Sequence, residues 1–177
     1  MGKLVVWRRT AVAHLNALGR SAALLVVLAA SMAAAADDDA PRNWFNDPFF
    51  QVTDAIPNCP LPAGPLLTET ERRVQAHHRA ERGTCCWLNG DCEQASAYAH
   101  DSQIADSLRA RWQAASFMTD ASLWITVQHG VVFVEGCVPP RESPAQIEAF
   151  VKATPQVQHA VVVVQSDPKA KPAYKVR

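Results

Sequence analysis

The segment between Ser122 and Gly136 constrains the fold of this chain more than any other, because it contains two strand patterns joined by a glycine. Alternate positions in both halves are aliphatic, at Leu123, Ile125, Val127, Val132 and Val134. Residues two apart lie on the same face of a strand, so these side chains are expected to share one face of a sheet. Gly130 suits a tight turn with positive φ, and Gly136 suits the point where the second strand leaves the sheet. The segment is therefore predicted to be a β-hairpin.

A helix is predicted on each side of this hairpin. Apolar residues recur at helical spacing, at Ile104, Leu108 and Trp112 in the first helix and at Ile147, Phe150 and Val151 in the second. Asp101 or Ser102 is expected to cap the first helix, and Ser143-Pro144 begins the second with a capping box. The Val-rich run 157–165 is predicted to be a last strand. Residues 101–165 thus predict an α+β domain, αββαβ, with both helices on one face of a three-stranded sheet.

These residues resemble a known family, the BON domain, named for bacterial osmotically induced and nodulation proteins. The resemblance lies in the Asp-x-x-Ile opening at Asp101 and Ile104 and in the run Gly-Val-Val-Phe-Val-Glu-Gly at 130–136. It departs from the family at 155–157, where Pro-Gln-Val replaces the usual Gly-Val. The resemblance implies a periplasmic, non-catalytic module that binds phospholipid membranes or envelope partners, with a role of the envelope or osmotic stress type.

The first 36 residues have the pattern of a cleaved bacterial signal peptide of the Sec type. A basic start is followed by an apolar run at 22–30 and by an Ala-x-Ala site within 33–36. The apolar run is shorter than the roughly 20 residues of a membrane-spanning helix. We therefore expect cleavage before Asp37, no transmembrane helix in the mature chain, and a periplasmic product.

The charge of the mature chain argues against a nucleic-acid partner. All 17 acidic residues lie after position 36, but only 13 of the 17 Lys and Arg residues do, so the mature chain carries a net charge of −4. A nucleic-acid-binding protein needs a basic footprint, and an anionic membrane does not attract this chain by overall charge either. Basic residues gather at 166–177, which is predicted to be a disordered, solvated tail, with a docking site as the alternative.

Residues 37–100 form a second region, rich in cysteine and proline. Aromatic residues gather at 44–50, and the prolines at 57–65 exclude a helix and favour an extended arm that lies across another surface. A helix is predicted over about 69–82, from a capping box at Thr68 and Glu71 to Gly83. Its apolar stripe is poor. A region of this composition buries little core alone and needs crosslinks or a neighbouring domain.

Crosslinks are available, because cysteines usually pair in the periplasm. The mature chain has five of them: Cys59, Cys85, Cys86, Cys92 and Cys137. The Asn-Gly turn between Cys86 and Cys92 lets these two meet, so a Cys86–Cys92 disulfide is predicted. Cys59 is expected to pair with Cys85 or Cys86, which leaves Cys137 single. A Cys59–Cys137 disulfide remains the alternative, because spacing alone does not determine connectivity.

Metal-binding and catalytic sites are both disfavoured. Histidines and cysteines gather at 77–92, but adjacent histidines point to different faces of a helix, and no Cys-x-x-Cys or His-x-x-x-His spacing occurs. The chain contains no Gly-x-Ser-x-Gly, phosphate-loop or dinucleotide-binding motif. A nucleophilic cysteine drawn from the same residues loses its thiol when a disulfide forms. We expect a protein that is not an enzyme and needs no metal or cofactor.

The face of the predicted sheet that the helices leave open is the candidate binding surface. Period two places four apolar residues there: Trp124, Phe133, Val162 and Val164. A soluble monomer seldom leaves such a patch bare, so either the arm at 44–65 or an external partner covers it. We expect a module that docks on an envelope protein or a phospholipid surface. The alternative is a thiol- or disulfide-linked interaction protein of the periplasm.

Overall fold

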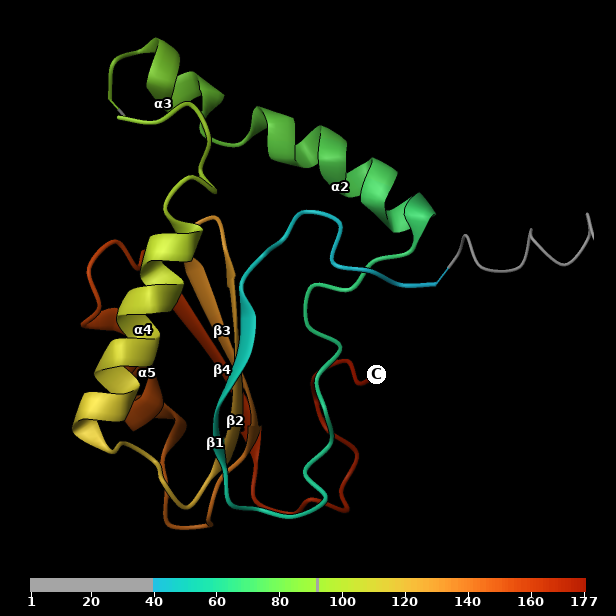
Figure 1. Cartoon of the computed structure of the whole chain (residues 1–177), viewed down its shortest axis with the longest axis vertical. Helices are drawn as coiled ribbons and strands as arrows, with labels where there is room; N and C mark the ends of the chain where they lie inside the picture. Colours follow the sequence, from blue (N-terminus) through green and yellow to red (C-terminus); the bar gives the residue numbers. More distant parts are fainter. Residues whose placement is uncertain (1–39, 92) are drawn as a thin grey trace, which may run out of the picture. The chain divides into compact units, whose positions relative to one another are not determined.

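The computed structural model describes residues 40–91 and 93–177, without the side chains of Thr84 and Cys86. The predicted signal peptide lies outside the described residues. Residues Pro41–Arg177 form one compact unit. Its elements in chain order are β1 (Phe49–Asp54), α2 (Glu69–Glu81), α3 (Thr84–Leu88), α4 (Asp101–Ala115), β2 (Ser122–Gln128), β3 (Val131–Cys137), α5 (Pro144–Lys152) and β4 (His159–Gln165), as Figure 1 shows.

The strands form one four-stranded mixed sheet in the order β1-β2-β3-β4. The first two pairings are antiparallel, and β3 and β4 run parallel. The α+β class is confirmed, but the prediction of a three-stranded sheet was wrong, because the segment Phe49–Asp54 adds β1 beside β2. Its sequence Phe-Phe-Gln-Val-Thr-Asp is rich in aromatic and β-branched residues, which suit a strand. The sheet thus contains strands from both regions, 37–100 and 101–165, which were predicted to be separate.

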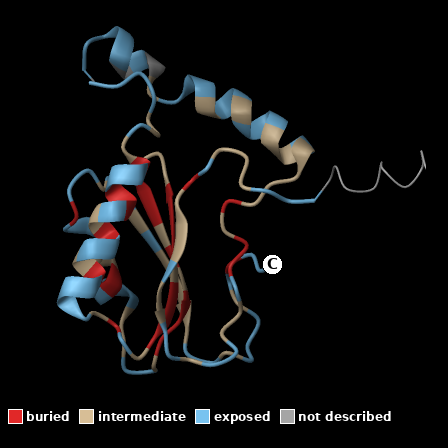
Figure 2. Cartoon of the chain, viewed as in Figure 1, coloured by how far each residue is buried: buried red, intermediate tan, exposed pale blue. Residues whose placement is uncertain are grey.

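Helices α4 and α5 cover the same face of the sheet, and the hydrophobic core lies between them and the strands (Figure 1). All five aliphatic residues predicted to face the helices are fully buried: Leu123, Ile125, Val127, Val132 and Val134. Figure 2 shows buried segments along the strands and on the side of α4 that faces the sheet. At one end of the core, Trp112 packs edge-on against Phe117 and Phe150, whose rings are stacked with centroids 4.1 Å apart.

The turn between β2 and β3 is formed by His129 and Gly130, which both have positive φ, 48° and 78°. Two central residues of this kind make the turn whose twist suits a hairpin, so the predicted role of Gly130 is confirmed. Gly136 differs from its prediction. It lies inside β3, paired with Leu123, and the strand continues to Cys137. A side chain at Gly136 would overlap the carbonyl oxygen of Ser122, so glycine allows the two strands to approach closely.

The ends of the helices follow the capping rules in two places and depart from them in a third. Thr68 with Glu71, and Ser143 with Gln146, form complete capping boxes at the starts of α2 and α5. At the start of α4 the N-cap position is His100 and makes no side-chain cap. The predicted cap at Asp101 or Ser102 was therefore wrong: both residues lie inside α4, and the carboxylate of Asp101 bonds to the β2–β3 turn instead.

Candidate binding surface

Helices α2 and α3 carry the most exposed apolar side chains of the described unit. The helix α2 has no buried residue. Val74 on α2 is 55% exposed, and Trp87 and Leu88 on α3 are 47% and 76% exposed. We call these three residues the α2–α3 surface. Burial within the single chain does not explain these large apolar side chains, so they are the candidate contact site.

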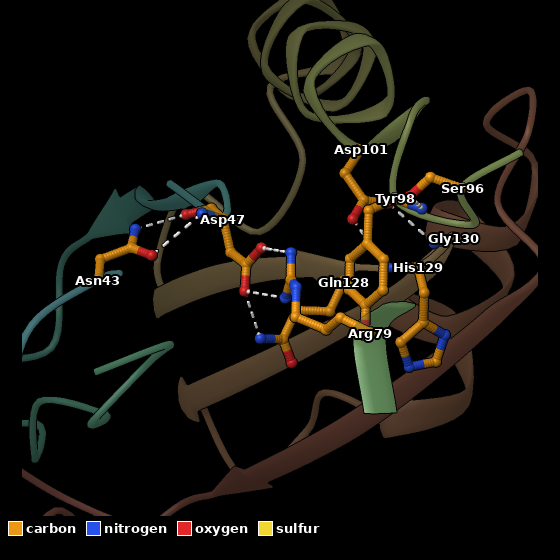
Figure 3. A network of polar contacts seen from close by, with 9 residues as sticks. All are labelled: Asn43, Asp47, Arg79, Ser96, Tyr98, Asp101, Gln128, His129 and Gly130. Carbon is orange, nitrogen blue, oxygen red and sulfur yellow. Dashed lines mark hydrogen bonds and ion pairs between the residues drawn. The ribbon is translucent and has the colours of Figure 1, made fainter. Parts of the chain in front are cut away.

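The helix α2 is attached to the rest of the unit through Arg79. Its guanidinium donates two hydrogen bonds, of 2.7 and 2.9 Å, to the carboxylate of Asp47, which is buried (Figure 3). The same guanidinium lies against the ring of Phe45 at 4.2 Å and that of Tyr98 at 3.6 Å from the centroid. A planar guanidinium suits both contacts, the bidentate pair and the stacking on aromatic rings. Arg79 thus links α2 to the segments before β1 and before α4.

Asp47 is held by further hydrogen bonds, of which the one from Gln128 reaches its buried carboxylate and those with Asn43 hold its backbone. The side-chain amide of Gln128 donates to its carboxylate at 2.6 Å. Asn43 accepts the backbone N–H of Asp47 at 3.0 Å and donates to its carbonyl at 2.8 Å. A buried carboxylate needs such partners, since an unpaired buried charge is very unfavourable. Figure 3 shows these partners converging on Asp47 from different elements.

Asp101 forms the second half of this polar network. Its carboxylate accepts the backbone N–H groups of His129 and Gly130 at 2.7 and 2.8 Å, which joins the start of α4 to the β2–β3 turn. Burial raises the pKa of Asp101, and the two hydrogen bonds oppose that shift. Burial also lowers the pKa of His129, whose ring lies edge-on to Tyr98. Each carboxylate oxygen of Asp47 and Asp101 accepts at least one hydrogen bond from the fold itself.

The start of α2 is fixed by a second group of charges and rings. The carboxylate of Glu69 accepts hydrogen bonds from Arg72 and Arg73, which hold its pKa at about 2. Arg72 also lies over the ring of Trp44, whose indole N–H donates to the carbonyl of Leu67 at 2.7 Å. The aromatic residues before β1 therefore pack against the base of α2, which keeps this helix in place without a buried apolar stripe.

The structure separates the four residues of the predicted binding patch. Trp124 and Phe133 face away from α4 and α5, as predicted, and are half-buried. Val162 and Val164 pack against the core on the helix side, so their predicted outward orientation was wrong. The reason is the register of the parallel pair, in which Val162 lies beside the inward-facing Val134. Val161 and Val163 take the outward positions instead.

The arm and the C-terminal tail lie over this outer face, beside Thr126 and Phe133. The two segments pair with each other through an antiparallel bridge between Pro62 and Val176. Tyr174 is buried, and its hydroxyl donates to the carbonyl of Pro60 at 2.8 Å. The tail is thus held by the arm, whereas the sequence predicted a disordered segment. The intramolecular cover expected for this face is the one observed, with the tail as a further part of it.

The disulfide in the structure is not the one preferred from the sequence. Cys59 forms a disulfide with Cys137, at an S–S distance of 2.06 Å, and Cys85 is an exposed free thiol. The predicted pairing of Cys59 with Cys85 or Cys86 was therefore wrong, and the alternative bridge is the one formed. This disulfide joins the arm to Cys137, the last residue of β3, on the face of the sheet away from α4 and α5. The predicted Cys86–Cys92 disulfide lies outside the described residues.

Among the described residues, no group of three or more His, Cys, Asp or Glu side chains is arranged to hold a metal ion. The Nε2 atom of His77 lies 3.4 Å from the Oε1 atom of Glu81, on an exposed face of α2. In the same part of the chain, no helix is long and apolar enough to cross a membrane.

Comparison with known proteins adds no assignment: no protein-family model, curated protein or solved structure matches this chain.

Proposed function

We propose that this chain is a non-catalytic binding module of the bacterial envelope, exported to the periplasm, that docks on a partner protein through the α2–α3 surface. The observation that carries the proposal is the exposure of Trp87 and Leu88 beside α2, a helix without a buried residue. Trp is enriched at the centres of protein interfaces, where a partner pocket encloses the ring. The polar network around Arg79 supports the proposal by holding α2 in a fixed position.

A protein partner is favoured over a phospholipid surface by charge. Residues 37–177 carry a net charge of −4, which gives no general attraction to anionic lipid. On α2, Arg72 and Arg73 are already paired with Glu69, and Arg79 is paired with Asp47. The partner is expected to offer an apolar groove, in the manner of a receptor for an amphipathic helix.

The periplasmic location and the resemblance to the BON domain are parts of the same proposal. A disulfide between residues 78 positions apart suits an oxidising compartment. The order α4-β2-β3-α5-β4 corresponds to the order of elements on which the resemblance rests. A module of this kind acts by binding a partner in the envelope, and the process that it serves is an envelope stress response.

The proposal is tested by capture from envelope fractions with the exported, processed protein. Trp87→Ser combined with Leu88→Ser removes the apolar side chains, and we expect at least a tenfold loss of captured partner. Leu61→Ser is the matched control, because Leu61 is also exposed but lies on the arm. Equal capture by the double variant and the wild type would contradict the proposal.

A vesicle experiment separates the two classes of partner. Vesicles of phosphatidylethanolamine and phosphatidylglycerol are mixed with the same proteins, and co-sedimentation is measured. We expect no binding of the wild type. Binding that Trp87→Ser and Leu88→Ser abolish would assign the α2–α3 surface to the membrane and would overturn the choice of a protein partner.

A second function, thiol-linked docking, is favoured by the exposed thiol of Cys85. This residue lies three positions before Leu88 on α3, and residues three apart share one face of a helix. Its thiolate would attack a disulfide of the partner, forming a mixed disulfide and releasing one partner thiolate, so no further oxidant is needed. Non-reducing electrophoresis of envelope extracts tests this function: a crosslinked species should disappear on reduction and with Cys85→Ser. If Cys85→Ser does not change the amount of captured partner, the thiol function is contradicted and non-covalent docking remains.

A further inference from the structure

We propose that β4 is a pairing edge through which two copies of this chain associate, strand against strand, into one continuous sheet. β4 is the last strand of the sheet, and its neighbour is β3. Across the described residues, no backbone hydrogen bond joins 159–164 to any segment other than β3. Alternate residues of a strand direct their N–H and C=O groups to opposite sides, so one row of these groups on β4 is left for another strand.

The sequence of β4 lacks the features that keep edge strands apart. Natural edges carry charges, prolines or bulges, which prevent pairing with another chain. β4 reads His-Ala-Val-Val-Val-Val-Gln and pairs with β3 in continuous register. The opposite edge, β1, is protected by a register shift between Gln51 and Thr53 and ends at Asp54. The two edges of the sheet therefore differ, and β4 is the one suited to pairing.

A second copy of this chain is the occupant that β4 fits best, because the strand is nearly symmetric about Val162. Antiparallel pairing about a twofold axis at this residue places Val161 of one copy opposite Val163 of the other. Ala160 then lies opposite Val164, and His159 opposite Gln165. The strand contains no Asp, Glu, Lys or Arg, so no like charges oppose each other.

The outer face of β4 provides apolar area for this contact. Val161 is 39% exposed in the single chain, and Val163 lies on the same face. Pairing would set these two valines against the same two valines of the second copy, and cross-strand pairs of β-branched residues stabilise sheets. The contact involves neither Trp87 nor Leu88, so the proposal is independent of docking through the α2–α3 surface.

Sedimentation equilibrium of the exported, processed protein over a range of concentrations tests the proposal. We expect a reversible dimer. Val161→Lys should lose the dimer at concentrations where the wild type is dimeric, because a lysine on an edge strand opposes pairing. Val176→Lys is the matched control, since it adds the same charge at an exposed valine of the C-terminal tail, outside β4, and it should dimerise like the wild type.

Hydrogen exchange of the wild type tests the proposal without any substitution, and so also when Val161→Lys does not fold. We expect the amides of β4 to exchange more slowly as the concentration rises, with unchanged exchange in β1. A monomer at every concentration would overturn the proposal. A strand of another protein would then be the remaining candidate to pair with β4. A dimer with concentration-independent exchange in β4, or one that Val176→Lys also abolishes, would overturn it as well.

Discussion

Arg79 and Asp47 form a buried ion pair that joins α2 to the rest of the unit. Their side chains are 14% and 4% exposed, so both charges lie largely out of water. A buried pair contributes little net stability compared with apolar residues of the same size, but removal of one partner leaves the other charge uncompensated. The pair therefore matters most for where α2 lies, and through α2 for the placement of Trp87 and Leu88.

Arg79→Ala should lower the free energy of unfolding by about 3 kcal/mol, because it leaves the buried carboxylate of Asp47 without its cation. Urea unfolding followed by circular dichroism measures this change. Arg73→Ala is the control, since Arg73 is exposed and pairs with Glu69 at the surface of α2, and it should lower the free energy of unfolding far less. Equal effects of the two substitutions would show that the Asp47 site is not buried in solution.

Glu135 determines part of the pH dependence of stability. It lies on the outer face of β3, and burial raises its pKa. A carboxyl whose pKa is higher in the folded chain binds more protons when folded. It therefore favours folding at acidic pH, and this contribution is lost as the pH rises through the folded pKa. Glu135→Gln should raise the free energy of unfolding at pH 7, with a difference that shrinks toward about pH 4. A difference independent of pH would contradict this assignment.

At the scale of elements, the β2–β3 hairpin depends on two glycines with different roles. Gly130 provides positive φ in the turn, whereas Gly136 provides space, since any side chain there would meet the backbone of β2 at Ser122. Strict alternation of aliphatic residues identified this hairpin and its buried face from sequence. The same argument failed for β4, because four consecutive valines contain no alternation and only the register with β3 sets their faces.

Gly136→Ala should lower the free energy of unfolding by more than about 3 kcal/mol, because the strands must separate to accommodate the methyl group. Gly90→Ala is the matched control: Gly90 also has positive φ, at 78°, but no atom lies within 4 Å of the added carbon. The control should cost about 1 kcal/mol, the strain of the left-handed conformation alone. Similar losses in both variants, measured by thermal unfolding, would contradict the close approach of β2 and β3.

At the scale of the whole molecule, the Cys59–Cys137 disulfide closes the outer face of the sheet by joining the arm to β3. Sequence reasoning predicted the arm, and it predicted intramolecular cover as one of two outcomes. It did not determine the cysteine partner, because pairing depends on where the arm lies in space rather than on spacing. It also missed β1, whose residues were assigned to the arm. The α2–α3 surface was visible only as a helix with a poor apolar stripe.

Cys59→Ser combined with Cys137→Ser should lower the free energy of unfolding by about 4 kcal/mol, because the disulfide closes a long loop in the unfolded chain. The same substitution should free the arm and expose Trp124, which shifts its fluorescence to longer wavelength. Urea unfolding monitored by fluorescence measures both effects. Unchanged stability would mean that the arm is held by its other contacts, such as that between Tyr174 and Pro60.

Site-specific photocrosslinking in the periplasm tests the central claim, docking through the α2–α3 surface, most directly. A photoreactive residue is placed at Leu88, and a second protein carries it at Leu61 on the arm. We predict one specific adduct from position 88, which excess unlabelled wild type competes away and which Trp87→Ser abolishes. Position 61 should give no such adduct. An adduct from both positions, or one from position 88 that persists with Trp87→Ser, would contradict the claim.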